Sequence, residues 1–264
     1  MNKLQQNQPL GSLQHGFFYS QLQGAELKKA REVYEQLYSA IRRHKKTLLI
    51  EWEEADEELM PRFLFLLLTD HPELFYASAE RTTFYYGKDF AEIHFAYGFS
   101  MLESWKLERK LKKQAVRLAQ MARNACGNDK AQQVKYLYHY LVTHISYADD
   151  TLKHGGEQEL YRIHSAVGAL LDGSAVCDGI ARAFKLILDE LGIESRLIRR
   201  AIREDMEFDH EWNMVLIQEE FLHIDATWEL NWYSKTKQVA YKYFMLTDEE
   251  MKKTHYGKEG NKHE

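Results

Sequence analysis

The spacing of apolar residues changes within residues 176–227, and this change limits what the chain can fold into. Ile180, Phe184, Ile187 and Leu191 recur at the helical period and predict a helix over about 176–191. Short apolar runs at 196–203, 212–218 and 221–227 then predict strands. A helix followed by a run of antiparallel strands indicates an α+β fold.

The rest of the chain divides into helical and strand-like patterns of the same kind. A break at 127–129, Gly-Asn-Asp, predicts a boundary between an N-terminal α/β extension, residues 1–127, and a second domain, residues 128–264. The mixed charged and histidine residues after Met251 predict a frayed tail. Helices are expected at 25–43, 57–69, 100–123, 134–145 and 164–171, a strand at 47–52, and a hairpin over 84–97 that turns at 87–89.

Composition argues against several classes of protein. A net charge of -5 is unlike the basic surface of a nucleic-acid binder. The longest apolar run, at 63–68, is too short to span a bilayer, and the N-terminal residues have no apolar signal-peptide core. Two cysteines in 264 residues fit a reducing compartment. We therefore expect a cytoplasmic protein without a membrane partner, although a secreted chain trimmed of its leader would look the same.

Cys177 lies at the start of the predicted helix over 176–191. Asp172, Gly173 and Ser174 supply turn and N-cap residues, so Cys177 falls in the first helical turn. Free backbone N–H groups and the helix dipole there favour a thiolate, and the same N–H groups can hold an oxyanion. Taken alone, a free cysteine is more often a buried structural thiol. Cys126, expected in a loop without partners, fits that interpretation.

His210 and Asp225 are candidate partners of Cys177. A thiol nucleophile needs an imidazole base, and the base needs a carboxylate that fixes its tautomer. A two-residue turn at 219–220 would leave His210 four residues beyond the position opposite Asp225, about 13 Å along the strand. A longer turn, a bulge or the coil at Asp209 is then needed to bring the two together.

Several segments together resemble the transglutaminase-like superfamily of cysteine acyl-transfer proteins. They are residues 161–193 around Cys177, HEWN at 210–213 and IDATW at 224–228, preceded by THISYAD at 143–149, within a resemblance over about 130–250. Ala175 stands where the family commonly has glycine, and Ala226 where it often has proline. The resemblance implies a papain-like core, in which the catalytic helix packs on an antiparallel sheet, preceded by the N-terminal extension.

The resemblance also implies a role for each matched residue. Cys177 would be the nucleophile, His210 the general base and acid, and Asp225 the residue that orients His210. Tyr147 matches an aromatic position near the cleft and would assist the oxyanion. Two further aromatic positions wall the site in the family, and they match Trp212 and Trp228.

The implied activity is thiol-dependent acyl transfer or hydrolysis through a thioester. Glutamine carboxamides or peptide bonds of a protein or peptide are the expected substrates, and transglutaminases, deamidases and cysteine proteases share the motif. No cofactor is predicted, and the oligomeric state stays open. The alternative is a non-catalytic binding or scaffolding module, because relatives that lost the triad act in that way. The presence of all three residue types favours an enzyme.

Other constellations carry weaker signals. His210, His223 and Asp225 could form a metal cluster, but no HExxH or paired CxxC spacing supports one, so no metal site is predicted. His223 is expected to pack or to support the site, and His164 to form a local hydrogen bond. Phosphate-binding glycine motifs are absent from the sequence. The N-terminal aromatic residues predict core packing, with a substrate-docking groove as the alternative: Phe17, Phe18, Tyr76, Tyr85 and Tyr86.

Overall fold

The computed structural model describes residues 17–22, 24, 27–53, 55–200 and 210–255. The chain divides into two compact units, Met1–Arg109 and Lys110–Glu264, and the division falls within helix α4 (Met101–Cys126). Gly127 follows α4 with φ +59°, so the predicted break in the helix is present. None of the helices in these described ranges combines the length and the apolar character that crossing a membrane requires.

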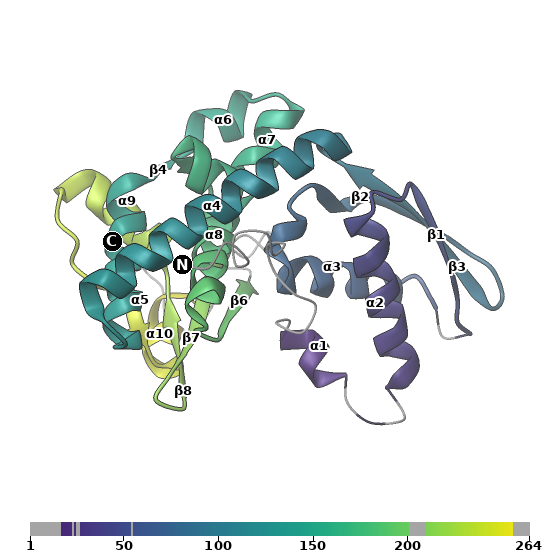
Figure 1. Ribbon diagram of the computed structural model, residues 1–264, viewed down its shortest axis with the longest axis horizontal. Coiled ribbons are helices and arrows are strands. Elements are labelled where there is room, and N and C mark those ends of the chain that lie inside the picture. The colour runs from purple at the N-terminus through teal and green to yellow at the C-terminus, as the bar shows by residue number, and fades with distance from the viewer. Residues whose placement is uncertain (1–16, 23, 25–26, 54, 201–209, 256–264) are drawn as a thin grey trace. The chain divides into compact units, whose positions relative to one another are not determined.

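The first unit is built on an antiparallel sheet of order β1-β3-β2, which helices α2 and α3 contact (Figure 1). The predicted hairpin is confirmed, and Gly87 N–H donates to the Phe90 carbonyl across its turn at 2.9 Å. The elements are α1 (Phe17–Gln21), α2 (Lys28–Arg42), β1 (Thr47–Glu51), α3 (Leu59–Asp70), the short 3-10 helix η3 (Pro72–Leu74), β2 (Ala77–Tyr86) and β3 (Phe90–Tyr97).

Of the five N-terminal aromatic residues predicted to pack in the core, Tyr76 alone is fully buried. Tyr85 is 56% exposed because side chains alternate along β2 and Tyr85 faces away from buried Ile93. Phe17, Phe18 and Tyr86 are half-buried. The core prediction was therefore wrong for Tyr85.

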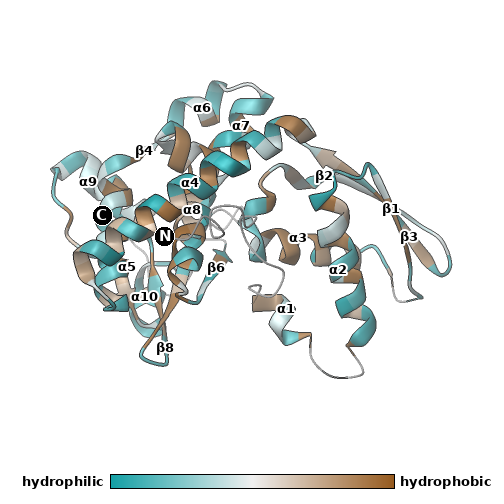
Figure 2. Cartoon of the chain, viewed as in Figure 1, coloured by the Kyte–Doolittle hydropathy of each residue, from teal (hydrophilic) through white to brown (hydrophobic). Residues whose placement is uncertain are grey.

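Helix α4 matches the helix predicted over 100–123. Figure 2 shows hydrophilic and hydrophobic residues interspersed along it. Its buried positions follow a spacing of three or four residues, so the charged residues occupy the remaining faces. The buried positions are Ser104, Glu108, Leu111, Ala115, Leu118, Ala119 and Ala122.

The second unit places helix α8 on an antiparallel sheet of order β6-β7-β8-β9, which confirms the predicted α+β core. The predicted strand over 196–203 is observed as β6, and its last three residues lie outside the described ones. The elements are α5 (Lys130–His144), β4 (Ser146–Tyr147), α6 (Asp149–His154), α7 (Glu157–Ile163), the π-helix η4 (Gly168–Asp172), β5 (Ser174–Ala175), α8 (Cys177–Leu191), β6 (Ser195–Arg200), β7 (His210–Ile217), β8 (Glu220–Ile224), α9 (Ala226–Thr236), β9 (Phe244–Leu246) and α10 (Asp248–His255).

The β7–β8 hairpin turns one residue earlier than expected. Gln218 and Glu219 form the turn with φ of +49° and +69°, the left-handed conformation that two-residue hairpins of type I′ require. Met214 therefore pairs with His223 and not with Asp225. This shift removes two of the four residues that separated His210 from the position opposite Asp225.

Two predictions for the C-terminal part were wrong. The strand predicted over 221–227 ends at Ile224, and Asp225 instead caps helix α9. The predicted frayed tail is helix α10 up to His255, and both Met251 and His255 have no exposed surface. Residues 256–264 lie outside the described ones.

Gly179, in the first turn of α8, is expected not to tolerate a larger side chain. A Cβ there would lie 2.3 Å from the Ile163 carbonyl oxygen and 3.0 Å from the Ala175 Cβ. Gly179→Ala should gain up to about 1 kcal/mol of helix propensity but lose more by displacing backbone, for a net destabilisation of about 2 kcal/mol. Urea unfolding measures this difference.

Gly156→Ala is the matched control, because a Cβ at Gly156 would meet only the flexible Glu159 carboxylate at 3.7 Å. Its free energy of unfolding should fall by about 1 kcal/mol or less, because Gly156 is the N-cap of α7, where alanine is less favourable than glycine. Equal effects of the two substitutions would contradict the close packing inferred for Gly179.

Candidate active site

Cys177 is the first residue of α8, as the sequence predicts, but the local structure differs from the expected cap. The N-cap position is Val176 and makes no side-chain cap. Ser174 and Ala175 form strand β5, which pairs in parallel with β4. Val176 therefore caps none of the first N–H groups of α8, although the Gly179 N–H donates to Asp178 Oδ1 at 2.9 Å, and Cys177 itself is half-buried.

Strand β7 is tied to α8 by polar side chains of the HEWN segment. Asn213 Nδ2 donates to the Ala181 carbonyl at 2.9 Å. The buried Glu211 carboxylate lies 3.3 Å from both Arg182, on α8, and Arg199, on β6. These contacts fix the strand that carries His210 against the helix that carries Cys177.

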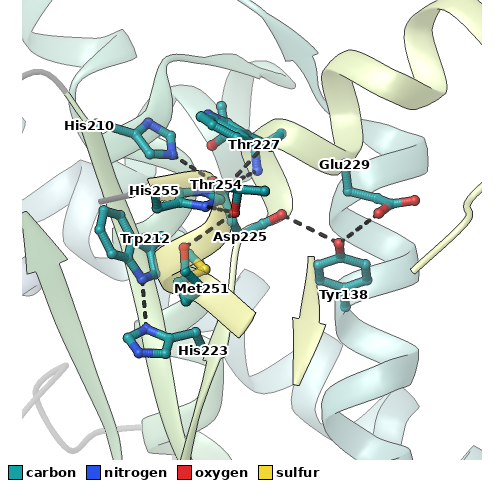
Figure 3. A network of polar contacts seen from close by, with 11 residues as sticks. Tyr138, His210, Trp212, His223, Asp225, Thr227, Glu229, Met251, Thr254 and His255 are labelled. Atoms are coloured by element: carbon teal, nitrogen blue, oxygen red, sulfur yellow. Dashed lines mark hydrogen bonds and ion pairs between the residues drawn. The ribbon is translucent and has the colours of Figure 1, made fainter. Parts of the chain in front are cut away.

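The Asp225 carboxylate is held by four N–H donors. Oδ1 accepts from the backbone N–H groups of Thr227 and Trp228 at 2.8 and 3.0 Å, because Asp225 caps α9. Oδ2 accepts from His210 Nε2 at 2.6 Å and from His255 Nε2 at 2.8 Å (Figure 3). The cap thus fixes the oxygen that receives both imidazoles.

The charges of this buried group stabilise one another. Burial opposes ionisation of both partners, yet the contact with Asp225 and the proximity of Cys177 raise the pKa of His210 to about 10. Burial raises the pKa of Asp225, but His210 and His255 lower it by more. The pKa of Asp225 therefore lies well below its ordinary value. Charged His210 therefore stabilises the folded state. This stabilisation is complete below pH 6.5, the pKa of His210 in the unfolded chain, and is lost as pH rises through about 10.

Since Nε2 of His210 donates to Asp225, Nδ1 is the nitrogen left for Cys177. The structure therefore brings together the three residues that the sequence singled out. The 13 Å separation is removed by the register of the hairpin and by the end of β8 at Ile224.

The three predicted aromatic residues surround this group. Trp212 is buried, with its ring centroid 5.7 Å from that of His210, and its Nε1 donates to His223 Nδ1 at 2.9 Å. The Trp228 ring lies 5.8 Å from His210. Tyr147, on β4, is half-buried; burial first and then the charge of Cys177 raise the pKa of its phenol, which therefore keeps its proton.

His255 is the residue of this site that the sequence analysis missed. It ends α10, is fully buried and stacks on Trp228 with ring centroids 3.9 Å apart. One signal was available: Thr247 and Glu250 form a capping box, in which each side chain accepts the other's backbone N–H. That pattern predicts a helix beginning at Asp248 and not a tail.

His210, Asp225 and His255 also form the one group of ligand atoms, among the described residues, that converges within 4.8 Å in a manner suited to a metal. The separations of 2.6 and 2.8 Å are hydrogen-bond lengths, and backbone N–H groups occupy the other oxygen. We therefore assign the group as a hydrogen-bond network. His223 supports Trp212, and His164 bonds Asp178 at 3.0 Å, so both have the local roles predicted for them.

Comparison with known proteins gives a family for the central part of the chain. The family model described as the transglutaminase-like superfamily matches residues 117–226, which include Cys177, His210 and Asp225. This part of the chain is therefore similar to the transglutaminase-like superfamily. No match was found among curated proteins.

Among solved structures, the chain is similar to a TGase, with 14% identity and a TM-score of 0.39, over 55% of this chain and 43% of the other. It is similar to a candidate cysteine protease from Cytophaga hutchinsonii, with 18% identity and a TM-score of 0.31, over 43% and 38%. A candidate protease from Parabacteroides distasonis gives 12% identity and a TM-score of 0.33, over 55% and 35%. The chain thus spans less than half the length of each.

The link between Asp225 and His210 predicts how His210 titrates. In the unsubstituted protein its ring should titrate near pH 10. In Asp225→Asn, burial should dominate and bring the pKa of His210 below the ordinary 6.5. NMR of the histidine rings against pH measures both values.

Asp248→Asn is the control, because it removes the carboxylate that contacts His223 at 2.7 Å and leaves Asp225 in place. It should leave the titration of His210 unchanged. If His210 titrates near 6.5 in the unsubstituted protein, or if Asp225→Asn has no effect, the electrostatic assignment is wrong.

Proposed function

We propose that this protein is a cysteine acyltransferase or hydrolase, acting on glutamine carboxamides or peptide bonds of a protein or peptide. The site lies in the proposed catalytic domain, residues 128–264. One observation supports this most strongly: His210 Nε2 bonds Asp225 at 2.6 Å, and Cys177, at the N-terminus of α8, lies close enough to His210 to raise the pKa of its ring. The transglutaminase-like match over 117–226 supports the same class of chemistry.

In the proposed reaction the Cys177 thiolate attacks the substrate carbonyl carbon, and the carbonyl electron pair moves to oxygen. The resulting oxyanion accepts hydrogen bonds from the Cys177 backbone N–H and from the protonated Tyr147 phenol. Because Asp225 holds His210 as an imidazolium, its Nδ1–H can protonate the departing nitrogen. The carbon–nitrogen bond breaks, ammonia or an amine leaves, and a thioester remains on Cys177.

A second nucleophile then resolves the thioester. Water or a primary amine attacks the carbonyl carbon and gives its proton to His210, and the carbon–sulfur bond breaks to restore the thiolate. With water the reaction is deamidation or proteolysis, and with an amine it is cross-linking. Trp212 and Trp228 keep the imidazole–carboxylate pair in an apolar surrounding, which strengthens it.

The two cysteines test the proposed activation. Both are half-buried and free, but Cys177 begins α8 whereas Cys126 ends α4, where the helix dipole disfavours a thiolate. Near neutral pH, iodoacetamide should label Cys177 about tenfold faster than Cys126, or more. His210→Ala should slow labelling of Cys177 and leave Cys126 unchanged, as mass spectrometry of the peptides measures. Equal, slow labelling would favour a non-catalytic scaffold.

Product analysis distinguishes the possible reactions. With a glutamine-containing protein substrate, ammonia release should depend on Cys177 and be abolished in Cys177→Ala. Incorporation of an added primary amine would indicate transamidation, ammonia release without incorporation deamidation, and peptide fragments without ammonia a protease. If none of these products forms in the unsubstituted protein, the proposed activity is wrong.

A further inference from the structure

His255 shares with His210 the carboxylate oxygen on which the proposed chemistry depends. Asp225 Oδ2 accepts from His210 Nε2 at 2.6 Å and from His255 Nε2 at 2.8 Å (Figure 3). His255 has no exposed surface, and Trp228 covers one face of its ring. It is thus placed to act on the site through Asp225, out of reach of a substrate.

The protonation state of His255 follows from its neighbours. Burial lowers the pKa of His255, and the nearby charge of His210 lowers it further against the opposing effect of Asp225. A neutral ring that donates from Nε2 must accept at Nδ1, and the Thr254 hydroxyl lies 2.7 Å from that nitrogen. His255 is therefore a neutral donor that adds no charge beside the His210 imidazolium.

We infer that His255 is a positioning residue. By donating to the same carboxylate oxygen, it weakens the attraction between Asp225 and the His210 imidazolium. A hydrogen bond donated to a carboxylate disperses its negative charge and weakens its attraction for a second donor. The backbone N–H groups of Thr227 and Trp228 already fix the orientation of the carboxylate through Oδ1. His255 therefore acts on the charge of the carboxylate and not on its orientation. This inference rests on the proposed role of His210 as proton donor.

The titratable neighbours of His255 and Asp225 come from several elements. Tyr138, on α5, places its hydroxyl 3.3 Å from the Asp225 carbonyl and 3.2 Å from Glu229. A substitution at position 255 leaves these residues themselves in place. The titratable groups around His255 and Asp225 in the described residues are Tyr138, Tyr147, Cys177, His210, His223, Glu229 and Tyr243, with Asp248 next to His223.

The titration of His210 tests the inference. His255→Leu removes the donor and keeps an apolar side chain, and should raise the NMR titration point of His210 by about one pH unit. His255→Gln retains an N–H donor near the position of Nε2. In this variant the titration point of His210 should stay within about 0.3 pH unit of its value in the unsubstituted protein. The alkaline limb of the acyl-transfer rate against pH should move with the titration in both variants.

His223→Gln is the control: it replaces another buried histidine that bonds Trp212 and not Asp225, and should leave the titration of His210 unchanged. If His255→Leu does not fold, Thr254→Val serves instead, since it removes only the hydroxyl at Nδ1 and should shift the titration upward by less. An unchanged or lowered titration point in the folded variant would overturn the inference. The NMR titration of His210 needs no substrate. Absence of acyl transfer in the unsubstituted protein would therefore contradict the proposed function and leave the NMR test of His255 standing.

Discussion

The Asp225 carboxylate is the group on which this site depends, because it belongs to the backbone structure and to the chemistry at once. Oδ1 caps α9 and Oδ2 receives two imidazoles, so every strong acceptor position faces an N–H group. A buried carboxylate without such partners costs several kcal/mol, whereas a fully bonded one is tolerated. The place where α9 begins therefore determines where the imidazole of His210 lies.

The approach of His210 to Cys177 has a similar structural origin. Asn213 and Glu211 flank Trp212 on β7, and both bond groups of the neighbouring elements: the Ala181 carbonyl and the Arg182 guanidinium of α8. A slip of β7 by one residue would reverse every side chain and leave a buried amide and a buried carboxylate unpaired. Polar contacts thus select the register that places His210 beside the thiol.

Sequence patterns predicted those parts of the structure that depend on local spacing. The period of Ile180, Phe184 and Ile187 is a property of α8 alone, and the residue types of the triad follow from chemistry. The register of the β7–β8 hairpin was beyond reach, because its turn uses Gln218 and Glu219 with positive φ although neither is glycine or asparagine. His255 was missed for another reason. Its helix could be recognised from the Thr247 and Glu250 pattern, but its contact with Asp225 arises only when α10 packs beside β8.

The second imidazole lessens a conflict within the proposed mechanism. A strongly held imidazolium favours the thiolate of Cys177, but a pKa of about 10 makes His210 a weak acid near neutral pH, and proton donation works best when the pKa lies near the operating pH. A lysine or arginine at position 255 would weaken the hold of Asp225 and would also repel the His210 imidazolium. A neutral histidine donates to the same oxygen without that repulsion. Burial under Trp228, which keeps His255 uncharged, is thus a requirement of its role and not a by-product of packing.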